Sequence, residues 1–132
     1  MLVGSGLAAG DGVFRWDSFL WTLMGALAIQ VAANFANDAS DAKRGADTKD
    51  RLGPPRMVSL GVITPSHMWM ATWIAIAVAA TAALALTVIA GPLILVIGIV
   101  SVLAMLGYVG GPFPYGYRAL GEVFVFTFFG LV

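Results

Sequence analysis

Long runs of apolar residues without a charge constrain the fold of this chain more than any other feature. Residues 18–37, 68–90 and 91–109 contain no charged side chain. A helix needs about 20 mostly apolar residues to cross a hydrocarbon core about 30 Å thick. The sequence therefore predicts an all-α fold, a polytopic membrane helical bundle with spans at about 18–37, 68–90 and 91–109.

The two ends of the chain are also apolar, but each is too short to cross a bilayer. Residues 1–10 lack the basic flank of a signal peptide and are expected to be the tail of an earlier helix. Residues 119–132 begin another apolar run and are expected to form a truncated span. We predict one partial domain over 1–132, with a loop at 38–66, and expect the chain to be a fragment.

Composition excludes several other classes of protein. Hydrophobic residues make up 60% of the chain and charged residues 11%, whereas soluble domains have about 45–50% and about 25%. A net charge of +0 gives no broad field that would attract nucleic acid. The absence of cysteine excludes disulfides, thiolate metal sites and cysteine nucleophiles. We expect a lipid bilayer around the protein and no nucleic-acid partner.

Basic residues predict the orientation of the chain in the membrane. Most of them lie in the loop at 38–66 or after the third span, at Lys43, Arg44, Lys49, Arg51, Arg56 and Arg118, whereas the opposite side holds Arg15. Short cytoplasmic loops of membrane proteins are enriched in Lys and Arg. The loop is therefore predicted to lie on the cytoplasmic side of the inner membrane.

Polar residues follow one face of the first complete span. They are spaced three or four residues apart, at Gln30, Asn34, Asn37, Asp38 and Asp41. Polar groups are costly in hydrocarbon and usually face a bundle interior or a wet cavity. The stripe is therefore predicted to enter the membrane from the cytoplasmic end and to face inward.

Two acids on this stripe form a candidate metal site. Asp38 and Asp41 are three residues apart, which places both carboxylates on one side of a helix. A divalent cation relieves their repulsion, and Mg²⁺ prefers one or two carboxylates together with waters and phosphate oxygens. Asn37 adds a neutral oxygen ligand or an orienting hydrogen bond, and the neighbouring basic residues could bind phosphate. Acids for a metal and bases for phosphate together predict a diphosphate site.

Two alternatives compete with this interpretation. One is an ordinary hydrophilic loop whose opposite charges pair in solvent, although such a loop needs no polar residue deep in the span. The other is a noncatalytic membrane protein, or a transporter fragment that binds or conducts a cation. Conduction needs polar groups across the whole membrane, and residues 68–109 offer only small hydroxyls such as Thr72, Thr81, Thr87 and Ser101.

Three ordered motifs resemble those of UbiA-type intramembrane prenyltransferases, in the branch that acts on 1,4-dihydroxy-2-naphthoate in menaquinone synthesis. NDASDAKRGAD at 37–47 resembles the first aspartate motif, NDxxDxxxGxD. RLGPPRMVSLGVITP at 51–65 is similar to that branch's RxGPxR…GxIT stretch, and YVGGPFPYGYRALGEVFVFTFFG at 108–130 to its PYGYxxLGE segment. The resemblance covers essentially the whole chain and about the first half of such an enzyme.

The resemblance implies a UbiA-like bundle, of which this chain would supply about four of nine helices around a central cavity. It implies an enzyme that transfers a polyprenyl group from polyprenyl diphosphate to dihydroxynaphthoate with loss of carbon dioxide, giving demethylmenaquinone, with Mg²⁺ as cofactor. Because a second aspartate motif would lie outside these 132 residues, we expect them to be inactive alone.

The resemblance also implies roles for particular residues. The metal ligands would be Asn37, Asp38 and Asp41, with Asp38 and Asp41 catalytic. The residues expected to bind substrate are Asn34, Asn37, Lys43, Arg44, Asp47, Arg51, Arg56, Tyr108 and Tyr115. Lys43 and Arg44 could equally snorkel to the interface or set the topology.

Glu122 has two interpretations that the sequence leaves open. As the third expected catalytic residue, it would form part of the active-site wall near the aromatic acceptor, as the resemblance implies. It could instead be a helix-start carboxylate favoured by the helix dipole. His67 lies at the start of a span and is expected to be an interfacial residue rather than a ligand.

Overall fold

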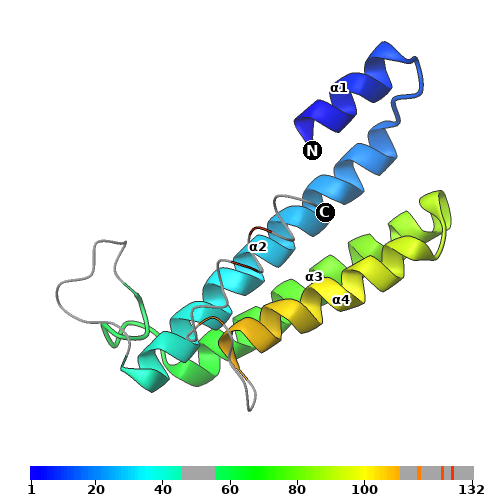
Figure 1. Ribbon diagram of the computed structural model, residues 1–132. Helices are drawn as coiled ribbons and strands as arrows, with labels where there is room; N and C mark the ends of the chain where they lie inside the picture. The colour runs from blue at the N-terminus through cyan, green and yellow to red at the C-terminus, as the bar shows by residue number, and fades with distance from the viewer. Residues whose placement is uncertain (46–55, 111–115, 117–122, 124–125, 127–132) are drawn as a thin grey trace.

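All regular elements of the described chain are helices. The computed structural model describes residues 1–45, 56–110, 116, 123 and 126. Its elements are α1 (Leu2–Gly10), α2 (Trp16–Arg44), α3 (Pro65–Ala90) and α4 (Leu93–Val109). Figure 1 shows α2, α3 and α4 running alternately in opposite directions along one another, with α1 turned back beside the beginning of α2. The predicted all-α fold is confirmed.

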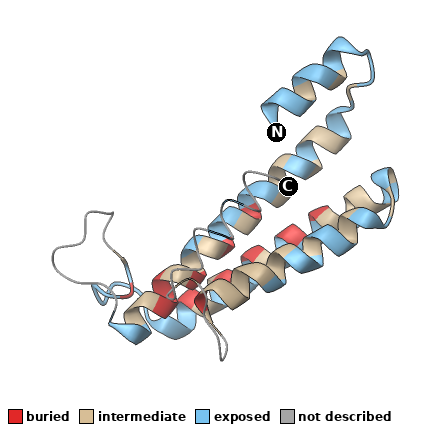
Figure 2. Ribbon diagram, viewed as in Figure 1, coloured by how far each residue is buried: buried red, intermediate tan, exposed pale blue. Residues whose placement is uncertain are grey.

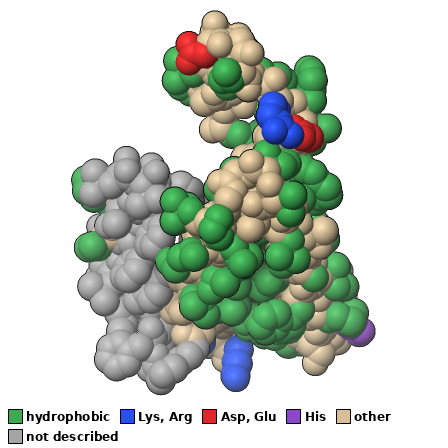
Figure 3. All heavy atoms as spheres, turned by 90° about the vertical axis from the view of Figure 1, so that its right-hand side faces the viewer, with side chains coloured by type: hydrophobic (Ala, Val, Ile, Leu, Met, Phe, Trp, Pro, Cys, Tyr) green, Lys and Arg blue, Asp and Glu red, His purple; other side chains and the backbone are tan. Residues whose placement is uncertain are grey.

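Two of these helices are long enough to span a membrane. α2 has 29 residues and α3 has 26, and both are sufficiently apolar to cross a bilayer, whereas the apolar helix α4 has 17. In Figure 3 hydrophobic side chains cover the middle of the visible face, and the described charged side chains lie towards its two ends. This distribution is typical of a helix bundle immersed in lipid.

Local sequence signals set the ends of the helices. Thr64 precedes Pro65, and its hydroxyl accepts a hydrogen bond from the backbone N–H of His67, as expected for a helix cap followed by proline. Gly91, with φ of 92°, makes the turn into α4. Gly45 ends α2 in the left-handed conformation, which glycine adopts without steric cost.

The predicted start of the loop at residue 38 was wrong. α2 continues to Arg44, so Asp38 and Asp41 lie on its last turns. The helix can continue because Ala39, Ala42 and the basic side chains of its last turn favour helix, the latter through the helix dipole. The expected span at 119–132 lies outside the described residues.

Small residues form the contact between α2 and α3. α2 buries Ala28, Ala32 and Ala36, and α3 buries Ala75, Ala79 and Ala82. A Cβ added to Gly25 would lie 3.3 Å from the Cβ of Ala82, so the two backbones pass close together. Figure 2 shows the buried residues along the facing sides of these helices. In lipid, such small residues stabilise helix pairs because they permit close van der Waals packing.

Candidate functional site

The deeper residues of the polar stripe, Gln30 and Asn34, lie on the side of α2 opposite its alanine face. Gln30 and Asn34 each lie two residues from a buried alanine, which is about 200° around a helix. Both side chains are exposed on the described surface, and the Asn34 amide donates a hydrogen bond to the backbone carbonyl of Gln30 at 2.9 Å. Within the described residues, the prediction that Gln30 and Asn34 face inward is therefore not confirmed.

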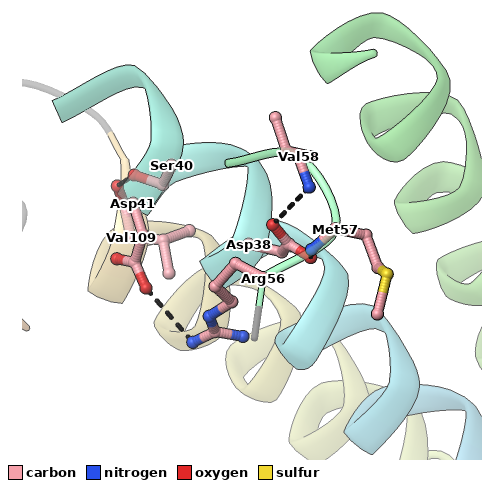
Figure 4. Close-up of polar contacts among 7 residues, drawn as sticks. All are labelled: Asp38, Ser40, Asp41, Arg56, Met57, Val58 and Val109. Carbon is pink, nitrogen blue, oxygen red and sulfur yellow. Dashed lines mark hydrogen bonds and ion pairs between the residues drawn. The ribbon is translucent and has the colours of Figure 1, made fainter. Parts of the chain in front are cut away.

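Asp38 is buried, and its carboxylate contacts backbone. Only 7% of the surface of Asp38 is exposed. One oxygen accepts a hydrogen bond from the N–H of Met57 at 3.0 Å, and the other accepts one from the N–H of Val58 at 3.2 Å. Figure 4 shows the carboxylate aimed at this pair of successive amides. Asp38 thereby ties the end of α2 to the segment that precedes α3.

Asp41 forms an ion pair with Arg56, a residue expected to bind diphosphate. The Arg56 Nη2 and the Asp41 Oδ2 are 3.1 Å apart, and the two side chains are only 18% and 14% exposed (Figure 4). The Arg56 Nε is buried without a hydrogen-bond partner in the described part of the chain. A guanidinium has five N–H donors in a planar fork that matches phosphate oxygens, so Arg56 retains donor capacity here.

The segment 56–63, which we call the docked segment, has a structure of its own. The N–H of Leu60 donates to the carbonyl of Arg56, and the N–H of Val62 donates to the carbonyl of Met57, both at 3.0 Å. The Val58 side chain is buried with Ala39 of α2 and Met68 of α3. This compact turn is therefore held against α2 and α3 by the buried Val58 side chain, and against α2 also by the hydrogen bonds to the Asp38 carboxylate.

Sequence reasoning missed Ser40, which joins α2 to α4. Its hydroxyl is buried and donates a hydrogen bond of 2.6 Å to the carbonyl of Val109, at the end of α4 (Figure 4). The carbonyls of a helix's last turn lack partners within the helix, so a buried hydroxyl stabilises this end. The only sequence signal was a small polar residue between the two acids of the motif.

The structure describes four of the remaining residues that the sequence predicts for the site, and four others lie outside its described part. Asn37 is half-buried on α2. Lys43 and Arg44 are exposed in its last turn, where positive charge interacts favourably with the helix dipole. Tyr108 is half-buried near the end of α4. Four residues lie outside the described part of the chain, namely Asp47, Arg51, Tyr115 and Glu122.

Tyr108 lies close to Gly116, another residue of the third motif. A Cβ added to Gly116 would lie 2.7 Å from the Cε1 of Tyr108, closer than real side chains approach. Only glycine fits this position unless Tyr108 moves. The PYGY pattern therefore includes a steric requirement for its glycine, which the sequence alone did not indicate.

The small hydroxyls of the spans form no polar path in the described residues. In α3 and α4 a hydroxyl donates to the backbone carbonyl four residues earlier in the same helix at Thr72, Thr81, Thr87 and Ser101. A groove of about 430 Å³ between α2, α3 and α4 is lined by small and aliphatic side chains such as Gly25, Leu86 and Ile94. Among the described residues, two of the three buried polar side chains, Asp38 and Ser40, lie at the end of α2 that carries the acids, and the third is Thr72.

The donor chemistry at this end suits magnesium. Asp38 and Asp41 supply carboxylate oxygens and Asn37 an amide oxygen, which are the hard ligands that Mg²⁺ prefers. Within the described residues no three His, Cys, Asp or Glu side chains form a cluster that could hold a metal. Phosphate oxygens and waters usually complete a magnesium site of this kind. The fit is therefore to a metal that arrives with a phosphorylated substrate.

Comparisons with known proteins agree on one family. The family model described as "UbiA prenyltransferase family" matches residues 1–132. A 1,4-dihydroxy-2-naphthoate octaprenyltransferase of Mycobacterium tuberculosis is 37% identical over 132 residues, which are 100% of this chain and 45% of that protein. The protein of the same name from Escherichia coli is 37% identical over 136 residues, covering 98% of this chain and 44% of the relative. The chain therefore spans under half the length of these relatives. No solved structure gives a significant match.

Proposed function

Because the chain belongs to the UbiA prenyltransferase family, we propose that it is part of a membrane enzyme that transfers a polyprenyl group to 1,4-dihydroxy-2-naphthoate. The donor is a polyprenyl diphosphate, and the acceptor loses carbon dioxide. The observation that carries the proposal is the pair Asp38 and Asp41 on the last turns of α2, with Arg56 3.1 Å from Asp41, at one end of an apolar bundle. Acids and a guanidinium at such a place suit a lipid diphosphate.

The basic residues of this end would bind the diphosphate. Arg56 offers a planar fork for two phosphate oxygens, and Lys43 and Arg44 add positive charge at the end of α2. As the carbon–oxygen bond of an allylic diphosphate breaks, negative charge develops on the leaving group. Fixed positive groups stabilise that charge without any proton transfer. This accounts for a site that needs no serine, histidine or cysteine nucleophile.

Asn37, Asp38 and Asp41 would hold magnesium. When bound, Mg²⁺ would supply additional charge stabilisation to the leaving diphosphate. The apolar helices would keep water away from the allylic cation, which the electron-rich aromatic ring then attacks. Tyr108, half-buried at the end of α4, is proposed to contact a substrate. We likewise propose that Asp47, Arg51 and Tyr115 bind substrate and that Glu122 forms part of the active-site wall.

The membrane orientation is part of this proposal. Lys43, Arg44 and Arg56 lie at the end of the bundle that carries the acids, whereas Arg15, ion-paired with Asp17 at 2.6 Å, lies at the other end of α2. The excess of basic residues supports a cytoplasmic position in the inner membrane for the acidic end. A cation conductor is less well supported, because the hydroxyls of Thr72, Thr81, Thr87 and Ser101 bond to their own helices.

Transfer of a radiolabelled polyprenyl group to dihydroxynaphthoate tests the proposal. The chain is expressed with any natural flanking sequence and assayed in lipid, with added magnesium and after chelation by EDTA. We expect product and carbon dioxide only with magnesium, and a loss of at least about 100-fold in kcat/KM for Asp41→Asn. Asp17→Asn, the same change at the other end of α2, is the matched control and should retain activity. Absence of transfer in lipid with magnesium and both substrates would refute the proposal.

A further inference from the structure

We propose that Asp38 and Asp41 have different tasks in the reaction. Asp38 is a positioning residue that holds the docked segment 56–63 against α2 throughout the cycle, and any contact that it makes with magnesium uses lone pairs that the two backbone N–H groups do not occupy. Asp41 is the carboxylate whose ion pair with Arg56 is exchanged when the diphosphate binds. This inference rests on the proposed function and gives the two acids of the motif separate roles.

The difference begins with what each carboxylate contacts. Asp38 binds two successive backbone N–H groups, of Met57 and Val58, with one on each oxygen. Asp41 binds the end of a long side chain, the guanidinium of Arg56. A backbone amide can leave its acceptor only if the segment moves, whereas a guanidinium can leave by rotating about side-chain bonds. The first contact is therefore fixed and the second exchangeable.

Burial makes the Asp38 contact costly to break. Asp38 and Val58 are both buried, and the Val58 side chain packs between α2 and α3 beside Ala39 and Met68. If Asp38 turned away, the buried N–H of Val58 and the partly buried N–H of Met57 would lose their acceptor, and buried backbone N–H groups are nearly always paired in native proteins. Hydrogen bonds to a carboxylate are also stronger than those between neutral groups. The carboxylate of Asp38 is thus a structural part of the docked segment.

The position of Arg56 follows from this anchor. Arg56 directly precedes the two amides that Asp38 binds, so Asp38 determines where the guanidinium begins. The ion pair with Asp41 uses Nη2, while the buried Nε has no partner in the described residues. An incoming diphosphate offers this guanidinium several oxygens at once. Arg56 then moves from Asp41 to phosphate, and the Asp41 oxygen that it leaves can turn to magnesium.

Hydrogen–deuterium exchange tests the anchor without any turnover. The protein, with any natural flanking sequence, is placed in lipid nanodiscs, and peptides covering 56–63 are followed by mass spectrometry. Asp38→Asn replaces one acceptor oxygen by a donor that faces a backbone N–H, so we expect the Met57 and Val58 amides to exchange at least about tenfold faster. Asp41→Asn, the matched change three residues later, should leave their exchange within about twofold. Peptides from α3 should be unchanged in both variants and report that the fold is intact.

A second measurement needs no variant. Magnesium pyrophosphate is added to the unmodified protein, and we expect the Met57 and Val58 amides to stay protected because Asp38 keeps them. Loss of that protection would mean that Asp38 leaves the segment for the metal, and would overturn the inference. Equal exchange of the segment in the two variants would overturn it as well. Neither measurement uses the aromatic acceptor. A failure of prenyl transfer would therefore refute the proposed function, and the exchange of the Met57 and Val58 amides would still show whether Asp38 holds the docked segment.

Discussion

Replacing Ala82 by leucine tests whether close approach of α2 and α3 holds the bundle together. Ala82 is 0% exposed, and its Cβ lies 3.3 Å from the place that a Cβ on Gly25 would occupy. A carbon added on the α2 side of this contact would already be closer than an ordinary van der Waals distance, and leucine at position 82 adds three carbons. Overpacking of this kind costs about 1–3 kcal/mol. Since about 1.4 kcal/mol is a factor of ten, the unfolding equilibrium constant should rise about 5-fold to 150-fold.

The matched control is Ala77→Leu, the same substitution on an exposed position of α3. Both variants are unfolded by increasing amounts of SDS in mixed micelles, and the loss of helix is followed by circular dichroism. We expect Ala82→Leu to unfold at a clearly lower SDS fraction and Ala77→Leu to remain close to the parent protein. Equal midpoints for the two variants would refute the small-residue contact as the source of stability.

Two other contacts give predictions for the same assay. A double-mutant cycle with Asp41→Asn and Arg56→Gln should give a coupling energy of about 1–3 kcal/mol. This exceeds the value for exposed ion pairs because both side chains are mostly buried. Additive effects of the two single substitutions would contradict a direct contact. Ser40→Ala should cost about 0.6–1.7 kcal/mol through loss of its bond to the end of α4, whereas Ser101→Ala, whose hydroxyl bonds its own helix, should cost less. If the two serine variants lost equal stability, the bond between α2 and α4 would contribute nothing.

The sequence alone predicted the helical class, the approximate positions of the spans and the residue types of the site, although it ended the first span before residue 38 and α2 continues to Arg44. Uncharged runs of about 20 residues can satisfy their backbone polar groups in lipid only as helices, so the helical class followed from composition and length. The Thr64 cap, the Pro65 start and the Gly91 turn were likewise local signals. The spacing of Asp38 and Asp41 indicated a shared side of one helix because the period of a helix is fixed.

Tertiary structure decided which partner each of these side chains has. Two acids three residues apart on one helix are alike as a pattern, yet Asp38 binds backbone and Asp41 binds Arg56. Ser40 reaches Val109 across 69 positions of sequence, and no periodic pattern encodes such a pairing. These contacts depend on how closely α2, α3 and α4 pack. That distance is set by alanine and glycine surfaces meeting one another, a property of two helices together rather than of either one.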